Sequence, residues 1–583
     1  MATAKYIAEP QSLQEPELDC NTKSPMAGPE QEHETEKAKS LDKALVKPIT
    51  QANLNSPRFW AILIALGFTG LLTALDATIT STALPSIVAD LGGGDLYIWA
   101  IDGYLLTLTS LQPLYGQLAN LFGRRWPLII SAAAFVLGSG ICAGASSMAM
   151  LVAGRIIQGI GAAGIGLLIE IVIADLVPLR QRGIYFAALF GLVALGTALG
   201  PFFGGLIVSN TTWRWVFWIN LPIGGLAIVL LVLFLQVKWD KKKSLASKLS
   251  LVDWTGNIVF IAAATSTLIA LSWAGAVYPW SSYRILVPLI VGFAGMGAFL
   301  LLQRSPTLCP NPTIPLHLLS NRTTATAYAL TFLHGFVTMW ILYFLPVYFQ
   351  GVKGSTPARS GVQLLPTILT ILPFAALGGG LLTKFGRYKP IHFAAFVVMS
   401  VGMGLFILID ENSSTGAWVG YQIINAAGAG LIISSLLPAA LAPLAEADVA
   451  QATGVWSFMR CFGMTWGTAI AGTIFNNRFD TLAKTHITSK ELRDQVTNGH
   501  AYEHAIKVFV DTLSQNDRHQ FAWTLNESLR RGWEVGIAFA AVGLLMVAFE
   551  KQIPLRNDLE TEYGMENPKA KQAADDHIDD SST

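Results

Sequence analysis

The sequence predicts an all-α polytopic membrane protein with two six-helix bundles and two extra helices, about 14 transmembrane helices in all. Only 13% of the 583 residues are charged and 52% are hydrophobic, whereas a soluble domain carries about a quarter charged residues. Apolar stretches recur from Phe59 to Phe549, and each has the roughly 20 residues needed to cross a bilayer. A short basic turn after Gly116 returns after Gly379, which indicates that one helical unit occurs twice.

The expected spans fall into groups of six, two and six along the chain. They lie near 59–84, 98–119, 126–145, 149–176, 184–207, 214–236, 254–274, 284–303, 325–350, 361–383, 390–410, 417–442, 453–475 and 533–550. We expect a disordered cytosolic tail over 1–58, a bundle over 59–236, two inserted helices with cytosolic loops over 237–324, and a second bundle over 325–550. That bundle includes an extracellular loop over 476–532, and a disordered cytosolic tail over 551–583 follows it.

Lys and Arg in the short loops set the expected orientation. The alternate loops that are rich in them contain Arg124 and Arg125, Arg180 and Arg182, and Lys384, Arg387 and Lys389. These loops should face the cytosol, which places both termini there, in the plasma membrane or alternatively the vacuolar membrane. The candidate glycosylation triplets on the opposite loops begin at Asn210, Asn412 and Asn526.

The basic turn reads GQLANLFGRR from Gly116 to Arg125. Its second copy keeps the glycines, the leucine, the phenylalanine and the first arginine, at Gly379, Leu381, Phe385, Gly386 and Arg387. Gly116 and Gly123 allow close backbone approach and a tight turn, while Arg124 and Arg125 can reach lipid phosphates or helix C-termini. A positive-inside anchor would explain one such turn, but the repetition favours a gating role for both.

Further motifs follow the apolar spans. They are Leu75-Asp76-x-Thr78, Arg155-x-x-Gln158-Gly159-x-Gly161, Gly196-x-x-x-Gly200-Pro201-x-x-Gly204-Gly205, Trp213-Arg214-Trp215 with Asn220, and Leu345-Pro346-x-Tyr348-Phe349-Gln350. With the basic turn they resemble the major facilitator superfamily, in particular its fourteen-span drug:proton antiporters of the fungal multidrug and toxin efflux type. The resemblance implies the major facilitator fold, alternating access, and a substrate site between the two bundles.

One position departs from that family's pattern. The family usually has Asp where this chain has Asn120, and the Asp would make charged contacts that lock the inner gate. Asn keeps the hydrogen bonding without the charge, and hydrogen bonds to ionised partners are the stronger ones. We therefore hypothesise that the stability of the inner gate, or its linkage to protons, differs here.

The fifth expected span carries the motif that marks antiporters within the family the chain resembles. Its residues are Gly196, Gly200, Pro201, Gly204 and Gly205. Small residues permit close helix contact in a membrane, and proline bends a helix. The span is thus expected to pack tightly and to flex during gating.

Charged residues inside the spans are expensive in lipid and indicate function. Asp76, Arg155 and Asp102 fall at similar depth from the outer side and are expected to share one layer. Two carboxylates around one arginine cannot both be compensated, so one of them should exchange protons. The alternative is a static Asp76–Arg155 pair with Asp102 reaching the headgroups. Glu170, deeper in the fourth span, is a second candidate for proton coupling.

Other polar and aromatic residues complete the expected site. Asp175 is expected to pair with Arg180 or Arg182. Arg460 has no partner that the sequence identifies, and His334 is expected to be neutral and bonded to a neighbouring helix. The candidates for the wall of the substrate cavity are Gln158, Phe202, His334, Trp340, Tyr343 and Trp456. Apolar and aromatic walls with few polar groups suit small organic ligands.

The leading functional hypothesis is proton-coupled efflux of drugs, toxins or secondary metabolites. We expect a monomeric transporter that needs no cofactor, metal or nucleic acid. A siderophore transporter and a vacuolar basic amino-acid transporter of the same fold are alternatives. A membrane-embedded enzyme is a distant one, since the nine histidines are scattered. ATP-driven transport is disfavoured because no Gly-x-x-x-x-Gly-Lys-Ser/Thr loop occurs.

Overall fold

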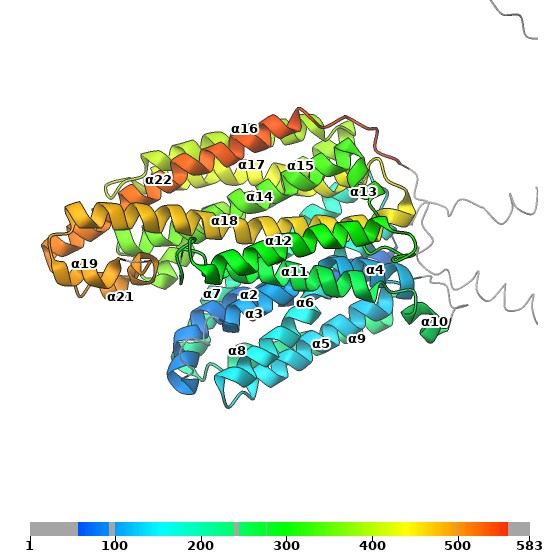
Figure 1. Cartoon of the computed structure of the whole chain (residues 1–583), viewed down its shortest axis with the longest axis horizontal. Coiled ribbons are helices and arrows are strands. Elements are labelled where there is room, and N and C mark those ends of the chain that lie inside the picture. The colour runs from blue at the N-terminus through cyan, green and yellow to red at the C-terminus, as the bar shows by residue number, and fades with distance from the viewer. Residues whose placement is uncertain (1–55, 93–98, 238–243, 276, 498, 558–583) are drawn as a thin grey trace, which may run out of the picture. The chain divides into compact units, whose positions relative to one another are not determined.

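The computed structural model describes residues 56–92, 99–237, 244–275, 277–497 and 499–557. These residues form helices and connecting loops without a strand, apart from one isolated bridge between Ala274 and Tyr278. The helices of the N-terminal half (Figure 1) are α2 (Pro57–Leu91), α3 (Trp99–Ser110), α4 (Gln112–Phe122), α5 (Arg125–Ala143), α6 (Met148–Leu176), α7 (Arg182–Asn210), α8 (Trp215–Trp218) and α9 (Asn220–Phe234).

The inserted pair and the C-terminal half follow. The insertion contains α10 (Leu245–Leu249), α11 (Trp254–Trp273), α12 (Tyr283–Arg304) and α13 (His317–Ser320). The long helices of the C-terminal half are α14 (Arg322–Val347), α15 (Pro357–Phe385), α16 (Lys389–Leu405), α17 (Thr415–Leu441), α18 (Val449–His486) and α22 (Gln515–Val547). Many of these helices begin at a serine or threonine whose hydroxyl accepts a hydrogen bond from a backbone N–H group in the first turn. Examples are Ser56, Ser147, Thr356 and Ser414.

Among the described residues, 11 helices are long and apolar enough to cross a membrane. They are α2, α5, α6, α7, α8 with α9, α11, α12, α14, α15, α16 and α17. The remaining predicted spans, near 98–119, 453–475 and 533–550, coincide with α3 and α4, with α18, and with α22. The polytopic helical fold is confirmed, and the count of fourteen spans stays a prediction.

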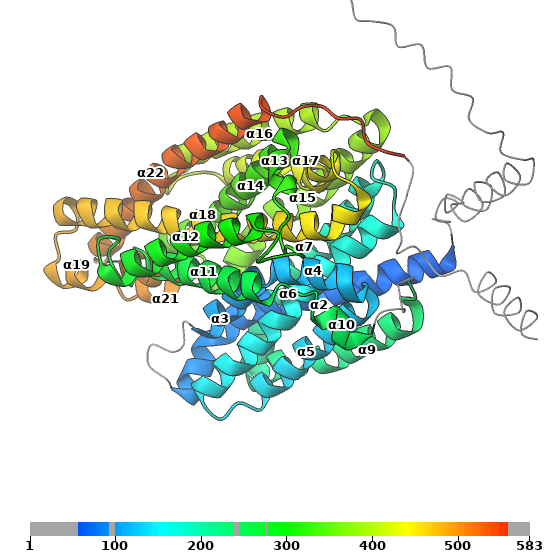
Figure 2. The same ribbon diagram turned by 45° about the vertical axis from the view of Figure 1, so that its right-hand side comes forward.

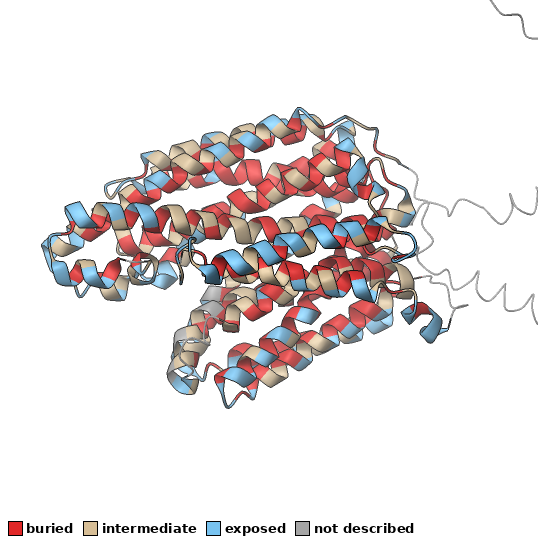
Figure 3. Ribbon diagram, viewed as in Figure 1, coloured by how far each residue is buried: buried red, intermediate tan, exposed pale blue. Residues whose placement is uncertain are grey.

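Helix pairing repeats between the two halves. In the N-terminal half α2 packs on α7 and α5 on α6, and in the C-terminal half α14 packs on α18 and α16 on α17. The most extensive contacts between the halves are those of α4 with α18 and of α7 with α15, and α7 with α17 and α6 with α18 also touch. Because α4 and α15 each lead into a copy of the basic turn, the first two crossings are equivalent under the duplication. Figure 3 shows buried residues on the faces that the helices turn towards one another.

The inserted helices α11 and α12 pack on each other, and α11 also contacts α3 and α18 (Figures 1 and 2). The region predicted as the loop 476–532 is largely helical. The helix α18 continues to His486, and α19 (Lys490–Val496), α20 (Ala501–His504) and α21 (Lys507–Val510) precede the start of α22 at Gln515. Apolar side chains such as Leu492, Val496 and Phe521 are buried there, so this region folds instead of forming an open loop.

Candidate functional site

A buried carboxylate, Asp76 on α2, lies at the centre of a polar network in the N-terminal half. Its Oδ2 accepts from Arg155 Nη1 at 2.6 Å, and its Oδ1 accepts from Asn220 Nδ2 at 2.6 Å and from Gln158 Nε2 at 3.1 Å. The Ser139 hydroxyl accepts from Gln158 and Asn220 at 2.6 and 3.3 Å. All five side chains are buried, and both oxygens of the carboxylate are therefore satisfied.

Arg155 on α6 is held from several sides. Its Nε donates to the Ala100 carbonyl on α3 at 2.9 Å, and its Nη1 also donates to Gln158 Oε1 at 2.9 Å. The guanidinium lies over the Tyr104 ring, 4.3 Å from the ring centroid, which is a favourable cation–π position. The network joins α2, α3, α5, α6 and α9, so it fixes their relative positions.

The structure corrects the prediction that Asp76, Arg155 and Asp102 share one layer. Asp102 does not join the Asp76–Arg155 pair. Its carboxylate instead accepts a hydrogen bond from Ser272 on the inserted helix α11. The network instead contains Asn220 and Ser139, neither of which was singled out as a site residue from the sequence. Asn220 stands alone as a polar residue at the start of an apolar helix, and that isolation is the signal that could have found it.

A second buried ion pair connects the two halves. Arg460 Nη2 on α18 donates to Glu170 Oε1 on α6 at 2.9 Å. The side chain of Glu170 is 2% exposed and that of Arg460 is 15% exposed. The Arg460 guanidinium lies 4.6 Å from the Trp456 ring centroid and 5.3 Å from that of Phe190 on α7. Glu170, which the sequence selected, thus has a partner that the sequence could not assign.

The other cavity candidates are not gathered at one place. His334 is buried and its Nε2 lies 3.2 Å from the Ala429 carbonyl of α17, so the ring donates there. Trp340 packs against Phe336 and Phe539 in the core. Tyr343 stacks on Tyr502 with centroids 5.4 Å apart. Phe202 is 65% exposed and contacts Phe203, and Gln158 belongs to the Asp76 network.

The first basic turn is anchored inside the protein. Gly123 adopts φ 77°, a backbone conformation that favours glycine. Arg124 is buried, its Nε donates to Asp175 Oδ2 at 2.6 Å, and its Nη1 donates to the Ala119 carbonyl at 2.6 Å. Asp175 was expected to pair with Arg180 or Arg182, and this expectation was wrong because α6 ends beside the start of α5.

Contacts between the halves gather at the end of the helices that carries the basic turns, which we call the basic end. Arg180 donates to the carbonyls of Thr383 and Lys384 at 2.8 and 2.9 Å. Arg182 Nη2 lies 3.3 Å from Glu446. Asn120 Nδ2 donates to the Ala447 carbonyl at 3.4 Å. Each of these contacts joins the N-terminal half to the C-terminal half.

The leading glycine of each basic turn sits in this contact. A Cβ added at Gly116 would lie 2.9 Å from the Ala450 carbonyl oxygen of α18. A Cβ added at Gly379 would lie 2.5 Å from the backbone of Gly183 on α7. The two copies of the motif therefore have the same structural role. In each, the leading glycine lets its helix pack closely against the opposite half.

The remaining gate candidates follow from their places in the fold. Gly386 ends α15 with φ 64°, Arg387 is exposed, and Arg125 Nη2 donates to the Val232 carbonyl at 2.8 Å. On α7 the motif glycines Gly196, Gly200 and Gly204 contact α2, where an added Cβ would meet Leu71, Thr78 and Thr82 respectively. Gly205 faces open space, and Pro201 lies between them within α7.

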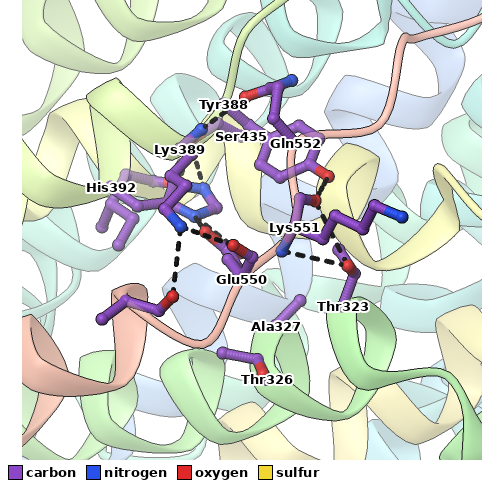
Figure 4. Close-up of polar contacts among 12 residues, drawn as sticks. Thr323, Thr326, Ala327, Tyr388, Lys389, His392, Ser435, Glu550, Lys551 and Gln552 are labelled. Carbon is purple, nitrogen blue, oxygen red and sulfur yellow. Dashed lines mark hydrogen bonds and ion pairs between the residues drawn. The ribbon is translucent and has the colours of Figure 1, made fainter.

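A segment that follows α22 crosses the basic end of the C-terminal half (Figure 4). Glu550 is buried, with its carboxylate 2.9 Å from His392 Nδ1, and His392 Nε2 lies 3.1 Å from Ser435 Oγ. Tyr388 donates to the Lys551 carbonyl at 2.5 Å. Further along, Arg556 donates to the Leu444 carbonyl at 2.7 Å and lies 3.4 Å from Glu446. This segment includes the start of the tail predicted to be disordered over 551–583, and it ties α16 to the loop that Arg182 contacts. The rest of that tail, and residues 1–55 of the predicted tail 1–58, lie outside the described residues.

The candidate glycosylation triplets lie towards the end opposite to the basic end. Asn210 is the last residue of α7, Asn412 is exposed in the turn before α17, and Asn526 lies within α22. In the described ranges no group of three or more His, Cys, Asp and Glu side chains could hold a metal ion.

Comparisons with known proteins bear on the family and the fold. A sequence model of the Major Facilitator Superfamily matches residues 66–468. The chain is 56% identical over 518 residues to the MFS-type transporter pydD of an Acremonium species, covering 89% of this chain and 90% of that one. It is 43% identical to the MFS-type efflux pump LUC4 of a Fusarium species, covering 87% and 90%. The proton:xylose symporter XylE has the same fold, with a TM-score of 0.54 at 15% identity over 87% and 99% of the two chains.

Proposed function

Because the chain belongs to the Major Facilitator Superfamily, we propose that it is a proton-coupled exporter of small organic compounds that works by alternating access. The family consists of membrane transporters and is not an enzyme class. Relatives that cover most of the chain are named efflux pumps, which supports export over uptake. We propose drugs, toxins or secondary metabolites as the cargo, and the plasma membrane, with the vacuolar membrane as the alternative, as the location.

The observation that carries this proposal is the Glu170–Arg460 pair. It joins α6 of one half to α18 of the other at a place where alternating access requires the halves to part. A buried charge pair that bridges two moving bodies must be weakened before they separate. Protonation of Glu170 supplies that weakening, because a neutral carboxyl attracts Arg460 less strongly.

We assign the two buried carboxylates different roles on their hydrogen bonds. Asp76 accepts from three side chains, with both oxygens used, so its ionised form is fully compensated and it serves as a fixed charge. Glu170 has Oε1 on Arg460, while Oε2 is buried and lacks a hydrogen-bond partner among the described residues. Glu170 is therefore the proposed site of proton exchange. Asp102, bonded to Ser272, is the less favoured candidate.

The described conformation fits one step of the cycle. At the basic end the two halves are joined through Arg180 and Arg182 and through the close contacts at Gly116 and Gly379. We propose that this end faces the cytosol, with both termini on that side, so that the inner gate is closed. Protons would then reach Glu170 from the outside as substrate leaves. Asn210, Asn412 and Asn526 would lie on the outer side, where glycosylation takes place, and a monomer suffices for the cycle.

Dye efflux from cells tests the proposal. Yeast cells that overproduce the full chain are loaded with an aminocoumarin, which is neutral, or with a cationic rhodamine, and efflux is followed with and without a protonophore. We expect faster efflux of at least one dye than from cells that produce the Glu170→Gln, Arg460→Gln double variant, and loss of the difference with the protonophore. Equal efflux of both dyes from the two strains would contradict the proposal.

A further inference from the structure

The surroundings of Arg460 contain buried polar atoms that no described residue satisfies. Besides Glu170 Oε2, these are Trp456 Nε1 and His334 Nδ1. Buried polar atoms are nearly always hydrogen-bonded, so each such exception calls for an explanation. Two of these exceptions, on α6 and α18, flank a single guanidinium, and the third, on α14, lies near enough for the charge of Arg460 to act on its ring.

These atoms belong to one neighbourhood. Glu170 bonds Arg460 at 2.9 Å, and the same guanidinium lies 4.6 Å from the Trp456 ring centroid. The helix that carries His334 approaches α18 closely, since a Cβ at Gly335 would lie 2.5 Å from the Arg460 carbonyl oxygen. Phe190 adds a second ring, 6.5 Å from Trp456 between centroids.

The hydrogen-bonding character of each atom follows from its partners. Trp456 Nε1 carries a hydrogen and can only donate. His334 Nε2 donates to a carbonyl, so Nδ1 of the neutral ring is an acceptor. Glu170 Oε2 is also an acceptor while the group is ionised. The neighbourhood therefore offers two acceptors, one donor and two aromatic faces.

The charge of the neighbourhood is balanced before any ligand arrives, because Arg460 already neutralises Glu170. Among the described residues, the further titratable groups that face the pair are Cys461, beside Arg460 on α18, and His334 on α14, whose neutral ring adds no charge. A cation would meet Arg460 as a like charge, and an anion would have to displace Glu170. An uncharged ligand meets neither cost.

We propose that Glu170 Oε2, Trp456 and Phe190 form a subsite for uncharged aromatic compounds that carry an N–H or O–H donor. The ring lies against Phe190 and Trp456, the donor bonds Oε2 of Glu170, and an acceptor on the ligand takes the Trp456 indole hydrogen. His334 Nδ1 receives a second donor where the ligand has one. This inference rests on the proposed function and specifies its substrate class.

The same oxygen then couples the ligand to the proton. Because Arg460 holds Oε1, a proton arriving at Glu170 binds Oε2, where it replaces the hydrogen bond from the ligand. One proton is taken up from the outer solution as one ligand leaves, and that proton is given up to the cytosol before the next ligand donates to Oε2. Occupation by ligand and by proton are mutually exclusive, which is the condition for exchange.

Two matched compounds test the subsite on the purified full chain in nanodiscs. An aminocoumarin has the N–H donor, and its N,N-dimethyl analogue keeps the ring and the carbonyl without it. We expect the aminocoumarin to bind about tenfold more tightly, equivalent to about 1.4 kcal/mol, with weaker binding at acidic pH. The analogue should show little dependence on pH.

Variants assign the effect to the atoms. In Glu170→Gln the amide carbonyl remains on Arg460 and the NH2 group replaces Oε2, so the preference and its pH dependence should both disappear. Trp456→Phe keeps a ring and removes the donor, which should weaken both compounds. Trp418→Phe makes the same change on α17, where Trp418 packs on Phe349, and should leave binding unchanged. Melting temperatures show that each variant is folded.

Equal affinity for the two compounds, tighter binding of a cationic rhodamine, an intact preference in Glu170→Gln, or no binding of either coumarin would each overturn the inference. The proposed function fails separately. If dye efflux from cells is absent while the purified protein keeps the donor preference, the export proposal is wrong and the subsite stands. If efflux is present without that preference, export stands and the subsite does not.

Discussion

Two carboxylates that are almost equally buried differ in how completely they are satisfied. Asp76 receives hydrogen bonds on both oxygens, whereas Glu170 has one oxygen on Arg460 and one without a described partner. Burying a charge is costly unless it is paired and hydrogen-bonded. The first arrangement suits a permanent charge that holds helices together, and the second suits a group that changes its protonation state.

Asp76→Asn should destabilise the protein strongly. The variant leaves the buried guanidinium of Arg155 without its counter-ion, and breaking a buried pair from one side typically costs about 3–5 kcal/mol. Thermal unfolding of the purified protein measures the loss. Asp102→Asn, which keeps a hydrogen-bond acceptor for Ser272, is the matched control and should melt near the wild type. Equal melting temperatures for both variants would show that Asp76 is not structural.

Although the family's Asp is expected to lock the inner gate, Asn120→Asp should loosen the basic end of this chain. The amide nitrogen of Asn120 donates to the Ala447 carbonyl across the two halves, and a carboxylate cannot. The contact of Asn120 Oδ1 with Arg124 Nη1 at 3.5 Å lies within the N-terminal half, so strengthening it does not hold the halves together. Loss of one such bond is worth about 1 kcal/mol, or about fivefold in the open population. Maleimide labelling of a cysteine introduced at the buried position Ala450 reports the opening. Unchanged labelling, transport rate and pH dependence would make the departure from the family's Asp incidental.

The sequence predicted which charged residues take part in buried ion pairs better than it predicted the partner of each residue. Asp76 and Arg155 stand out because charges are rare in spans, and they do pair. Asp175 was assigned to arginines near it in sequence, yet it pairs with Arg124. Partners depend on which helix ends meet in space, and a single sequence does not contain that information.

The glycine motif of α7 explains how closely this helix packs against α2. Its glycines at 196, 200 and 204 follow one another every four residues, which places them on one face of the helix. That face contacts α2, and Gly205 lies off it. The close approach of α2 and α7 thus depends on the absence of side chains along one stripe.

Gly200→Ala should weaken the packing of α2 on α7. Its Cβ would overlap the Thr78 hydroxyl, and overpacking of a tight contact costs about 1–3 kcal/mol. Gly205→Ala, five residues further on the same helix, meets open space and should be neutral or slightly stabilising, since Ala favours helix over Gly. Melting temperatures of the two purified variants decide the matter. A loss of the same size in both would refute the packing account.

The extent of the helices was harder to predict than their existence. Apolar runs located α5, α6, α11, α12 and α14 closely, since a hydrophobic span has a fixed minimum length. The sequence predicts a loop where α18 and α22 continue, because the polar composition there resembles that of a solvated segment. Their folding depends on burial of scattered apolar residues such as Leu492 and Phe521, which a search for long apolar runs does not detect.

For the molecule as a whole, the duplication has a mechanical meaning. Gly116 and Gly379 occupy equivalent places in the two halves, and each packs against the opposite half at the basic end. The crossings of α4 with α18 and of α7 with α15 are therefore a symmetric pair. The two halves are thus joined by the symmetric contacts at the basic end and, deeper in the protein, by the Glu170–Arg460 ion pair. Both sets of contacts must break before the halves can separate at that end.

Gly379→Ala should hold the basic end apart. The added Cβ would meet the backbone of Gly183, and neither backbone can yield as a flexible side chain would. Labelling of the Ala450→Cys reporter should rise in the variant. Gly380→Ala changes the neighbouring residue, which has nothing within 4 Å, and should leave labelling at the wild-type rate. Equal rates in the two variants would contradict a closure built on Gly379.

The central claim is that Glu170 exchanges the proton that drives export. The most direct measurement is the initial rate of aminocoumarin efflux from cells as a function of external pH, for the wild type and for Glu170→Gln at equal surface expression. We predict that efflux by the wild type accelerates as the external medium becomes more acidic, because protonation of Oε2 releases the ligand, and that efflux by Glu170→Gln does not respond to external pH. A variant that retains the wild-type pH dependence would contradict the claim.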